Sequence, residues 1–270
     1  MATAKDITVK PISAKAARAL VQRVHYSGKT VQNSQLHLGV YLGGKLEGAM
    51  QFGPPLDKRK IQGLVSGTAW NGFIELNRMA FSDRLPRNSE SRAIAIAMKL
   101  IRKHYPGIEW VISFADGTQC GDGTIYRASG FELTAINKSL NLVRLPCGEV
   151  VHKMTLESSP TSPRRELGGK SYYGITGGKY NLAKYAEVTG GKVIPGFQLR
   201  YIYFINPDAR GRLIAPILPF SKIEEMGAGM YKGEKVSRGK QATSEHPSVS
   251  GGAAPTPTLH TIETEDGGSS

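Results

Sequence analysis

The sequence has little cysteine, no apolar run of membrane length and a minority of acidic residues. Cys120 and Cys147 are the two cysteines among 270 residues, which excludes a disulfide framework or a cysteine-rich zinc module and favours a reducing cytoplasm. No apolar stretch approaches the roughly 18 residues of a membrane helix, and the N-terminus lacks the apolar core of a signal peptide. We therefore expect no membrane association.

Several catalytic motifs are absent as well. The chain has no Gly-x-x-x-x-Gly-Lys-Ser/Thr loop, no strand followed by Gly-x-Gly-x-x-Gly, and no His-x-x-x-His or Cys-x-x-Cys pair. The Asn/Asp-Pro-Pro-aromatic loop of adenine methyltransferases is missing too, because the nearest stretch, 206–209, reads Asn-Pro-Asp-Ala. These absences argue against P-loop, dinucleotide-binding, zinc and adenine methyltransferase sites.

Basic residues are in excess and unevenly distributed. The chain holds 35 Lys and Arg against 22 Asp and Glu, a net charge of +13. Residues 241–270 contain four acids and no Lys or Arg, so residues 1–240 carry a net charge of +17. This surplus favours a polyanionic partner, above all nucleic acid, although a solvated basic surface would have the same composition.

Two changes in composition divide the chain. The stretch 157–165 places two prolines among hydroxyl residues and predicts a linker. Near the C-terminus the sequence becomes rich in Ser, Thr, Gly and Pro, which predicts a disordered acidic tail. We therefore expect a first domain over 1–157, a C-terminal extension over 158–235 and a tail over 236–270.

Hydrophobic patterns alternate between helical and extended spacing. Helices are predicted over 13–25, from 89 or 91 to 105, and over 124–129. Strands are predicted over 36–42, 45–52, 72–81, 110–115, 140–145, 150–156, 199–205 and 212–217. The strand–helix–strand centre implies parallel pairing and the hairpins imply antiparallel pairing. The expected fold class is therefore α+β, a mixed β-sheet flanked by helices with a β-containing C-terminal extension.

The loop before the central helix has the composition of an anion site. The first-turn N–H groups of a helix lack partners within the helix and attract anions. Guanidinium, amide and hydroxyl donors are added by Arg87, Asn88, Ser89, Ser91 and Arg92. A pyrophosphate or a nucleic-acid phosphate fits such a loop, but a capped helix with a solvated basic loop has the same residue types.

Polar residues also stand within or at the ends of the predicted elements. Asp116 ends a strand before a glycine-rich loop, a position where ligands bind in open α/β sheets, although Asp before Gly also caps turns. His25 and Tyr26 end the first helix. Strand alternation places Arg78 on the face opposite Glu75. An Arg in a buried strand needs a carboxylate or a ligand as its partner.

The order of the elements, closed by the stretch 126–131, resembles the GNAT acyltransferase superfamily. In that superfamily the loop before the central helix binds the pyrophosphate of coenzyme A. The resemblance implies a cofactor site formed by Arg87, Asn88, Ser89, Ser91, Arg92 and Tyr126. This loop departs from the superfamily pattern Gln/Arg-x-x-Gly-x-Gly/Ala because it contains no glycine.

More closely, several stretches taken in order are similar to the Mom family of phage DNA-modification proteins, a divergent GNAT branch. The similar stretches are 25–27, 38–41, 75–80, 88–91 and 113–116, within a similarity that extends over residues 8–233. The family implies conversion of adenine N6 in duplex DNA to a carbamoylmethyl (acetamido) form. This change blocks host restriction and takes place in the cytoplasm of the infected bacterium.

The same resemblance implies roles for individual residues. The implied catalytic positions are Tyr26, Tyr41, Arg78, Ser91 and Asp116. Iron is implied as a metal, with Tyr26 and Asp116 as its ligands, because phenolate and carboxylate oxygens suit ferric iron.

The implied product constrains the acyl donor. In this product a CH2 group joins N6 to a terminal amide. Acetyl transfer from acetyl-CoA would instead join the carbonyl carbon to N6, and it supplies no nitrogen for the amide. We hypothesise a glycyl donor, carried as a coenzyme A thioester or on an aminoacyl carrier, whose acyl transfer is followed by exchange of the two nitrogens. Iron-dependent coupling of an acetyl group is the alternative.

Adenine N6 is paired in duplex DNA, so the target base must leave the stack. The candidate stacking residues are Tyr172, Tyr173, Tyr201 and Tyr203, although strand packing explains the last two better than stacking does. The expected phosphate contacts are Lys58, Arg59, Lys60, Arg164 and Arg165.

Two other functions fit the same sequence. A GNAT enzyme that acylates a small amine or a protein would turn over coenzyme A without DNA. A non-catalytic DNA-binding protein on this scaffold would bind DNA and leave its nucleosides unchanged.

Overall fold

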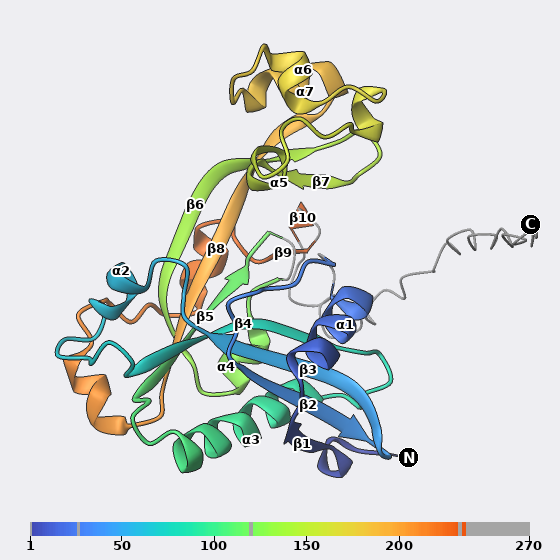
Figure 1. The fold of residues 1–270 in the computed structure, drawn as a ribbon. Helices are drawn as coiled ribbons and strands as arrows, with labels where there is room; N and C mark the ends of the chain where they lie inside the picture. The colour runs from blue at the N-terminus through green and yellow to red at the C-terminus, as the bar shows by residue number, and fades with distance from the viewer. Residues whose placement is uncertain (1, 26–27, 119–120, 232–233, 236–270) are drawn as a thin grey trace, which may run out of the picture.

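The computed structural model describes residues 2–25, 28–118, 121–231 and 234–235, and its centre is one mixed β-sheet (Figure 1). Eight strands follow one another in the order β1–β2–β3–β4–β5–β8–β6–β7. β4 pairs with β5 in parallel, and the other neighbouring strands pair antiparallel. The structure thereby confirms the α+β class with a mixed sheet flanked by helices. The tail predicted over 236–270 lies outside the described residues.

The first half of the sheet is an antiparallel meander. Gly43 and Gly44 both have positive φ angles, which lets the chain turn between β2 and β3 as the sequence predicts. The four strands are β1 (Thr8–Pro11), β2 (Leu36–Leu42), β3 (Lys45–Gly53) and β4 (Phe73–Phe81).

One face of the sheet is covered by α1 (Ala14–Val24) and α2 (Lys58–Gln62). α1 begins at Ser13, whose hydroxyl caps it, and packs an apolar stripe against Ala49 and Ala80. α2 buries Ile61 in a cluster with Phe73 and Trp110, whose rings stack 4.4 Å apart. Paired residues in neighbouring strands share a face, and one extra residue in β4, Asn77, brings Phe73 and Ala80 onto the same face. These contacts therefore place both helices on the same side of the sheet. We call it the α1/α2 face.

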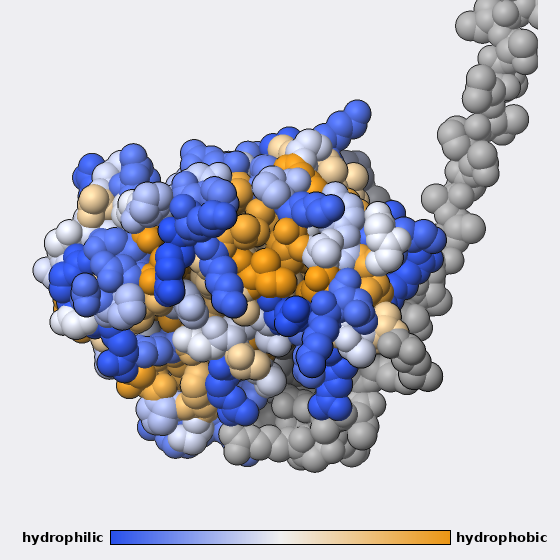
Figure 2. All heavy atoms as spheres, turned by 90° about the horizontal axis from the view of Figure 1, so that it is seen from below, coloured by the Kyte–Doolittle hydropathy of each residue, from blue (hydrophilic) through white to orange (hydrophobic). Residues whose placement is uncertain are grey.

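The opposite face is covered by α3 (Ser89–His104), which joins β4 to β5 (Trp110–Asp116), and by α4 (Thr124–Ala128). α3 buries Ile94, Ala97, Met98 and Ile101 in the main core, the spacing of an amphipathic helix. β5 begins beside the start of β4, so α3 runs antiparallel to both strands. Its N-terminus therefore lies at the edge where β4 and β5 end. Seen from below, the side of α3 in Figure 1, the surface shows an apolar area ringed by hydrophilic side chains (Figure 2).

β6 (Glu132–Arg144) and β8 (Lys192–Phe204) form a long antiparallel ribbon that rises from the sheet (Figure 1). On one side β8 pairs with β5 over residues 198–204, and on the other it pairs with β6 over residues 192–202. The ribbon carries a module, here called the arm, with its own core around the buried Tyr172 and Tyr185. The arm contains β7 (Val150–His152), α5 (Lys153–Glu157), η2 (Arg165–Leu167), α6 (Tyr172–Thr176) and α7 (Leu182–Thr189).

The remaining elements are short. They are η1 (Ala4–Asp6), η3 (Pro207–Arg212), α8 (Ser221–Glu225), and the separate pair of β9 (Met230–Tyr231) and β10 (Glu234–Lys235). Among all the helices described, none combines the length and the apolar character needed to cross a membrane.

One predicted strand is absent and another is shorter than expected. Residues 212–217 do not return as a strand: Asn206 Oδ1 accepts from Asp208 N (3.1 Å) and caps η3, and Leu213 forms a single bridge to Val65. The strand expected over 150–156 ends at His152, because His152 Nδ1 accepts from Met154 N (3.0 Å) and starts α5. The strand expected over 140–145 is the end of the much longer β6.

The stretch expected as a linker packs into the arm. Tyr173 N donates to the carbonyl of Pro160 (2.9 Å), and Pro163 bridges to Ser171. β8 shares the sheet with strands of the first segment, so the boundary expected at residue 157 separates strands of one sheet. The division into three parts stays a prediction.

Candidate functional site

The two parallel strands diverge in the middle of the sheet. β4 and β5 pair over only three residues of each, 73–75 and 110–112, and both strands continue beyond. Ser113 bridges the opening: its hydroxyl donates to the carbonyl of Leu76 (3.2 Å) and hydrogen-bonds with the Tyr126 hydroxyl of α4 (2.9 Å). Tyr126 also stacks on Tyr201, with ring centroids 4.9 Å apart. The predicted cofactor residue Tyr126 is therefore held at this opening.

A β-bulge sets the direction of the polar side chains on β4. Gln51 of β3 pairs with Arg78 and Phe52 pairs with Leu76, so Asn77 is an extra residue on β4. Glu75 pairs with Gly53, and residues 51 and 53 of one strand share a face. Glu75 and Arg78 therefore share the α1/α2 face. The simple alternation that placed them on opposite faces is wrong because the bulge interrupts it.

Glu75 occupies an unusual environment for a carboxylate. Burial raises the pKa of Glu75 from 4.5 to about 7, and a hydrogen bond with Asn77 and the charge of Arg78 limit the rise. Asn77 is held in turn, because its Oδ1 accepts from Ser34 Oγ (3.0 Å). A carboxyl group with this pKa takes up and releases a proton near neutral pH.

Arg78 connects Glu75 to the end of α1. Its Nε donates to the carbonyl of Lys29 (3.3 Å), in the chain that follows the helix. Burial, together with the nearby charge of Arg78, lowers the pKa of His25, the last residue before that chain, to about 4. His25 is thus a neutral imidazole at pH 7, able to donate or accept a hydrogen bond.

Asp116 ends β5 on the same face of the sheet as Glu75, because Glu75 pairs with Ile112 and residues 112 and 116 of one strand share a face. Its Oδ1 accepts from Thr118 N (2.9 Å), so the turn-capping role considered above is present. The Asp116 charge also acts on His152 of the arm. Burial lowers the pKa of His152, the negative charge of Asp116 raises it in part, and the positive charge of Lys29 lowers it. Lys29 Nζ donates to Thr155 Oγ1 of α5 (2.8 Å). The chain after α1, the end of β5 and the base of the arm therefore meet.

We call Glu75, Arg78, His25, Asp116 and His152 the polar cluster. Sequence reasoning placed Arg78 and Asp116 in the site and noted His25 and Glu75 without committing to them. It missed His152, because this histidine reaches Asp116 only through the folding of the arm. Glu75 could have been identified from the sequence, because it is a charged residue within a strand whose neighbouring residues are apolar.

Tyr41 lies away from this cluster. Arg78 of β4 pairs with Gln51 of β3, and Gln51 pairs with His37 of β2. Tyr41 is four residues further along β2, about 13 Å at the rise of a strand. Lys10 lies over its ring, 5.8 Å from the centroid. Tyr26 is outside the described residues.

The N-terminus of α3 forms a second candidate site. Its N-cap is Asn88 rather than Ser89 or Ser91, and Asn88 has a left-handed φ of 69° that Asn tolerates better than most residues. This loop therefore makes its left-handed turn without glycine. Ser91 Oγ donates to the carbonyl of Asn88 (3.2 Å). The Ser89 hydroxyl is fully buried and has no hydrogen-bond partner among the described residues.

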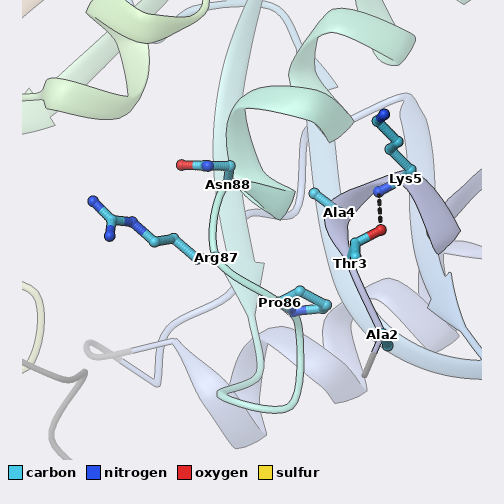
Figure 3. Close-up of a pocket in the computed structure, with 7 residues that line it drawn as sticks. All are labelled: Ala2, Thr3, Ala4, Lys5, Pro86, Arg87 and Asn88. Atoms are coloured by element: carbon cyan, nitrogen blue, oxygen red, sulfur yellow. Dashed lines mark hydrogen bonds between the residues drawn. The ribbon is translucent and has the colours of Figure 1, made fainter.

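A surface hollow of about 470 Å³ lies between this loop and η1 (Figure 3). Its lining residues are Ala2, Thr3, Ala4, Lys5, Pro86, Arg87 and Asn88. In Figure 3 the side chains of Arg87 and Asn88 extend in the same direction, away from Lys5. Arg92 is exposed in the first turn of α3. The donor types predicted for a phosphate site are thus gathered at one helix end.

The residues predicted to contact DNA phosphates differ in their surroundings. Arg59 and Lys60 are exposed on α2, whereas Lys58 Nζ donates to Asn71 Oδ1 (3.0 Å) and lies 4.6 Å from the centroid of the Trp70 ring.

In the arm, Arg165 is exposed, but Arg164 is paired with Glu166 (3.4 Å) and donates to the carbonyl of Thr155 (3.3 Å). Tyr172 and Tyr201 are fully buried, which removes them as base-stacking candidates.

The described residues do not form an iron site. Among them, no three His, Cys, Asp or Glu side chains are grouped to hold a metal ion. The expected ligand pair combines Asp116 with Tyr26, which is outside the described part of the chain.

The protein is thus of the α+β class, and the titratable groups of its polar cluster lie where the parallel strands β4 and β5 diverge. The sequence model described as the Mom protein family matches residues 6–222. The chain is 40% identical to the methylcarbamoylase Mom of Escherichia phage Mu over 211 residues, 77% of this chain and 80% of that protein. This chain belongs to the Mom family.

Solved structures show a more distant similarity. A Bacillus subtilis acetyltransferase in complex with CoA is 10% identical, with a TM-score of 0.39 over 73% of this chain and 97% of that one. A GNAT family acetyltransferase of Elizabethkingia anophelis with acetyl-CoA bound is 12% identical, with a TM-score of 0.37 over 72% of this chain and 97% of that one.

Proposed function

We propose that this protein is a transferase that converts adenine N6 in DNA to the N6-carbamoylmethyl form and so protects phage DNA from restriction in the host cytoplasm. Membership of the Mom family and the relative named methylcarbamoylase support the class of reaction. The net charge of +13 supports DNA as the substrate. The single observation that carries the proposal is the polar cluster, in which a carboxyl that titrates near neutral pH lies beside a guanidinium.

The cluster supplies what acyl transfer to an amine requires. As N6 attacks the donor carbonyl, the N6–carbonyl bond forms, the bond to the leaving group breaks, and N6 loses a proton. We infer that Glu75 accepts this proton, because its pKa of about 7 leaves much of it ionised at neutral pH. Arg78, whose charge acts on Glu75, is placed to stabilise negative charge that develops on the carbonyl oxygen.

A glycyl donor completes the product without an oxidant. Acyl transfer yields N6-glycyl adenine, whose free amine then attacks C6 and forms a five-membered spiro ring. Cleavage of the original C6–N6 bond opens this ring and leaves C6–NH–CH2–CO–NH2. One nitrogen gains a proton as the other loses one, and Asp116 and His152 are the groups of the cluster available to move it.

The N-terminus of α3 is the proposed binding site for the phosphate groups of the donor, whether coenzyme A or an aminoacyl carrier. Arg87, Asn88 and Arg92 supply exposed donors there, and the buried Ser89 hydroxyl has an unused hydrogen bond. Ser91 and Tyr126 remain proposed contacts to the donor. Arg59, Lys60 and Arg165 are the exposed members of the proposed DNA contacts.

The test is mass spectrometry of nucleosides from cells that express the chain with isotopically labelled glycine. We expect carbamoylmethyl adenine with both glycine carbons labelled. The Asp116→Asn and Glu75→Gln variants should lose most of the product, whereas Asp83→Asn, a change at an exposed acid outside the cluster, should not. Unlabelled product would eliminate the glycyl donor. Unmodified adenine with the wild-type chain would favour the small-amine acyltransferase or the non-catalytic DNA-binding protein.

A further inference from the structure

The loop between β3 and α2 exposes a large apolar side chain beside the polar cluster. Leu56 is 92% exposed, more than any other large hydrophobic residue of the described chain. A single exposed leucine is ordinary on a protein surface. Leu56, however, is almost completely exposed on a loop whose conformation is constrained, which suggests a role for its side chain in binding.

The loop that carries Leu56 is held at both ends. Pro54 and Pro55 restrict the backbone before it, and Pro55 is buried. The carbonyl of Pro54 accepts from Asn33 Nδ2 (3.2 Å) and from Asn77 Nδ2 (3.5 Å). After Leu56, the Asp57 side chain caps α2 by accepting from Lys60 N (3.2 Å). These contacts hold Leu56 out in solvent.

The same contacts place Leu56 close to the proposed chemistry. Gly53 pairs with Glu75 across β3 and β4, and Asn77 both supports Glu75 and anchors Pro54. Leu56 comes three positions after Gly53, and three residues of extended chain span about 10 Å at most. The loop leads directly into α2, so it lies on the α1/α2 face together with Glu75 and Arg78.

The surroundings of Leu56 are basic. Arg59 and Lys60 are exposed one helical turn further on, and Lys58 lies over the half-exposed Trp70 ring. Asp57 is the one acid among residues 53–62, and its side chain caps the helix. An apolar side chain followed by exposed Arg and Lys residues is complementary to duplex DNA, in which negatively charged phosphates flank an apolar stack of nucleobases.

We propose that Leu56 is a wedge that enters the base stack of duplex DNA and occupies the space of the adenine that is extruded toward Glu75 and Arg78. Leu, Phe, Ile, Met and Pro act as wedges between base steps in other DNA-bending proteins. This inference rests on the proposed function, because adenine N6 is inaccessible in a paired base. Leu56 is a positioning residue in this scheme, since it touches the stack and not the reacting atoms.

The experiment compares Leu56→Ala with the wild-type chain on two DNA substrates. One is a fully paired duplex, and the other has the target adenine opposite an abasic site, where extrusion costs less. We expect Leu56→Ala to lose roughly tenfold or more of the modification rate on the paired duplex and less than about twofold on the unpaired target. Leu140→Ala, at a 63% exposed leucine on β6, is the matched control and should retain both rates.

A second readout separates this inference from the proposed function. In a duplex with 2-aminopurine at the target position, wild-type protein should raise the fluorescence of the unstacked base, and Leu56→Ala should not. Equal rates of Leu56→Ala and wild type on the paired duplex would overturn the wedge. Equal losses on both substrates would overturn it as well, since they indicate a general contact with DNA or protein. If the wild-type chain modifies neither substrate, the proposed function fails and the fluorescence alone decides the wedge.

Discussion

Replacing Glu75 with Gln should stabilise the fold by about 3 kcal/mol at alkaline pH and by less than about 1 kcal/mol at about pH 5. Burial raises the pKa of Glu75 from 4.5 to about 7, so the folded chain keeps a proton that the unfolded chain releases. The stability of the wild-type protein therefore falls as the pH rises from 4.5 through 7. The shift corresponds to about 3 kcal/mol in favour of the neutral form, and this loss is complete above pH 7.

Gln resembles the neutral carboxyl group in shape and cannot ionise. The variant should therefore lack the penalty, and the difference in unfolding free energy between variant and wild type should grow from less than about 1 kcal/mol at about pH 5 to about 3 kcal/mol at about pH 8.5. Urea unfolding of both proteins at the two pH values measures it. Taking the difference removes the contribution of every other titrating group.

Glu47→Gln is a control of opposite sign. A hydrogen bond from Ser82 (2.6 Å) lowers the pKa of Glu47, so its charged form stabilises the fold above its ordinary pKa. Its replacement should destabilise the protein at both pH values. A Glu75→Gln variant whose stability relative to wild type does not change with pH would refute the buried, neutral carboxyl group and with it the proton acceptor of the proposed reaction.

The remaining predictions concern the two surfaces around the site. Asn88→Ala should lower the unfolding free energy by about 1 kcal/mol, because Ala pays more than Asn for a left-handed φ, whereas Asn88→Gly should not; equal stabilities of the two variants by urea unfolding would contradict this. Replacing Arg59 and Lys60 with Gln should reduce the slope of log K against log salt by about 1.8 in DNA binding. An unchanged slope would remove α2 from the interface.

Much of the fold could be predicted from local patterns. The strand pairs around Gly43-Gly44, the amphipathic α3 and the buried β5 each follow from periodicity and turn residues that act over a few positions. The short, polar or long-range elements could not. β8 enters the sheet between β5 and β6, and no local pattern encodes which neighbour a strand takes.

The candidate site divides in the same way. Residue identity and order are enough to establish the basic surplus, the similarity to the Mom family and the candidacy of Arg78 and Asp116. The three-dimensional fold was needed to put Glu75 on the same face as Arg78, since the bulge at Asn77 depends on the register of β3. It also decided that His152 belongs beside Asp116, because that proximity requires the arm to fold back over the strand ends, a contact between residues distant in the chain.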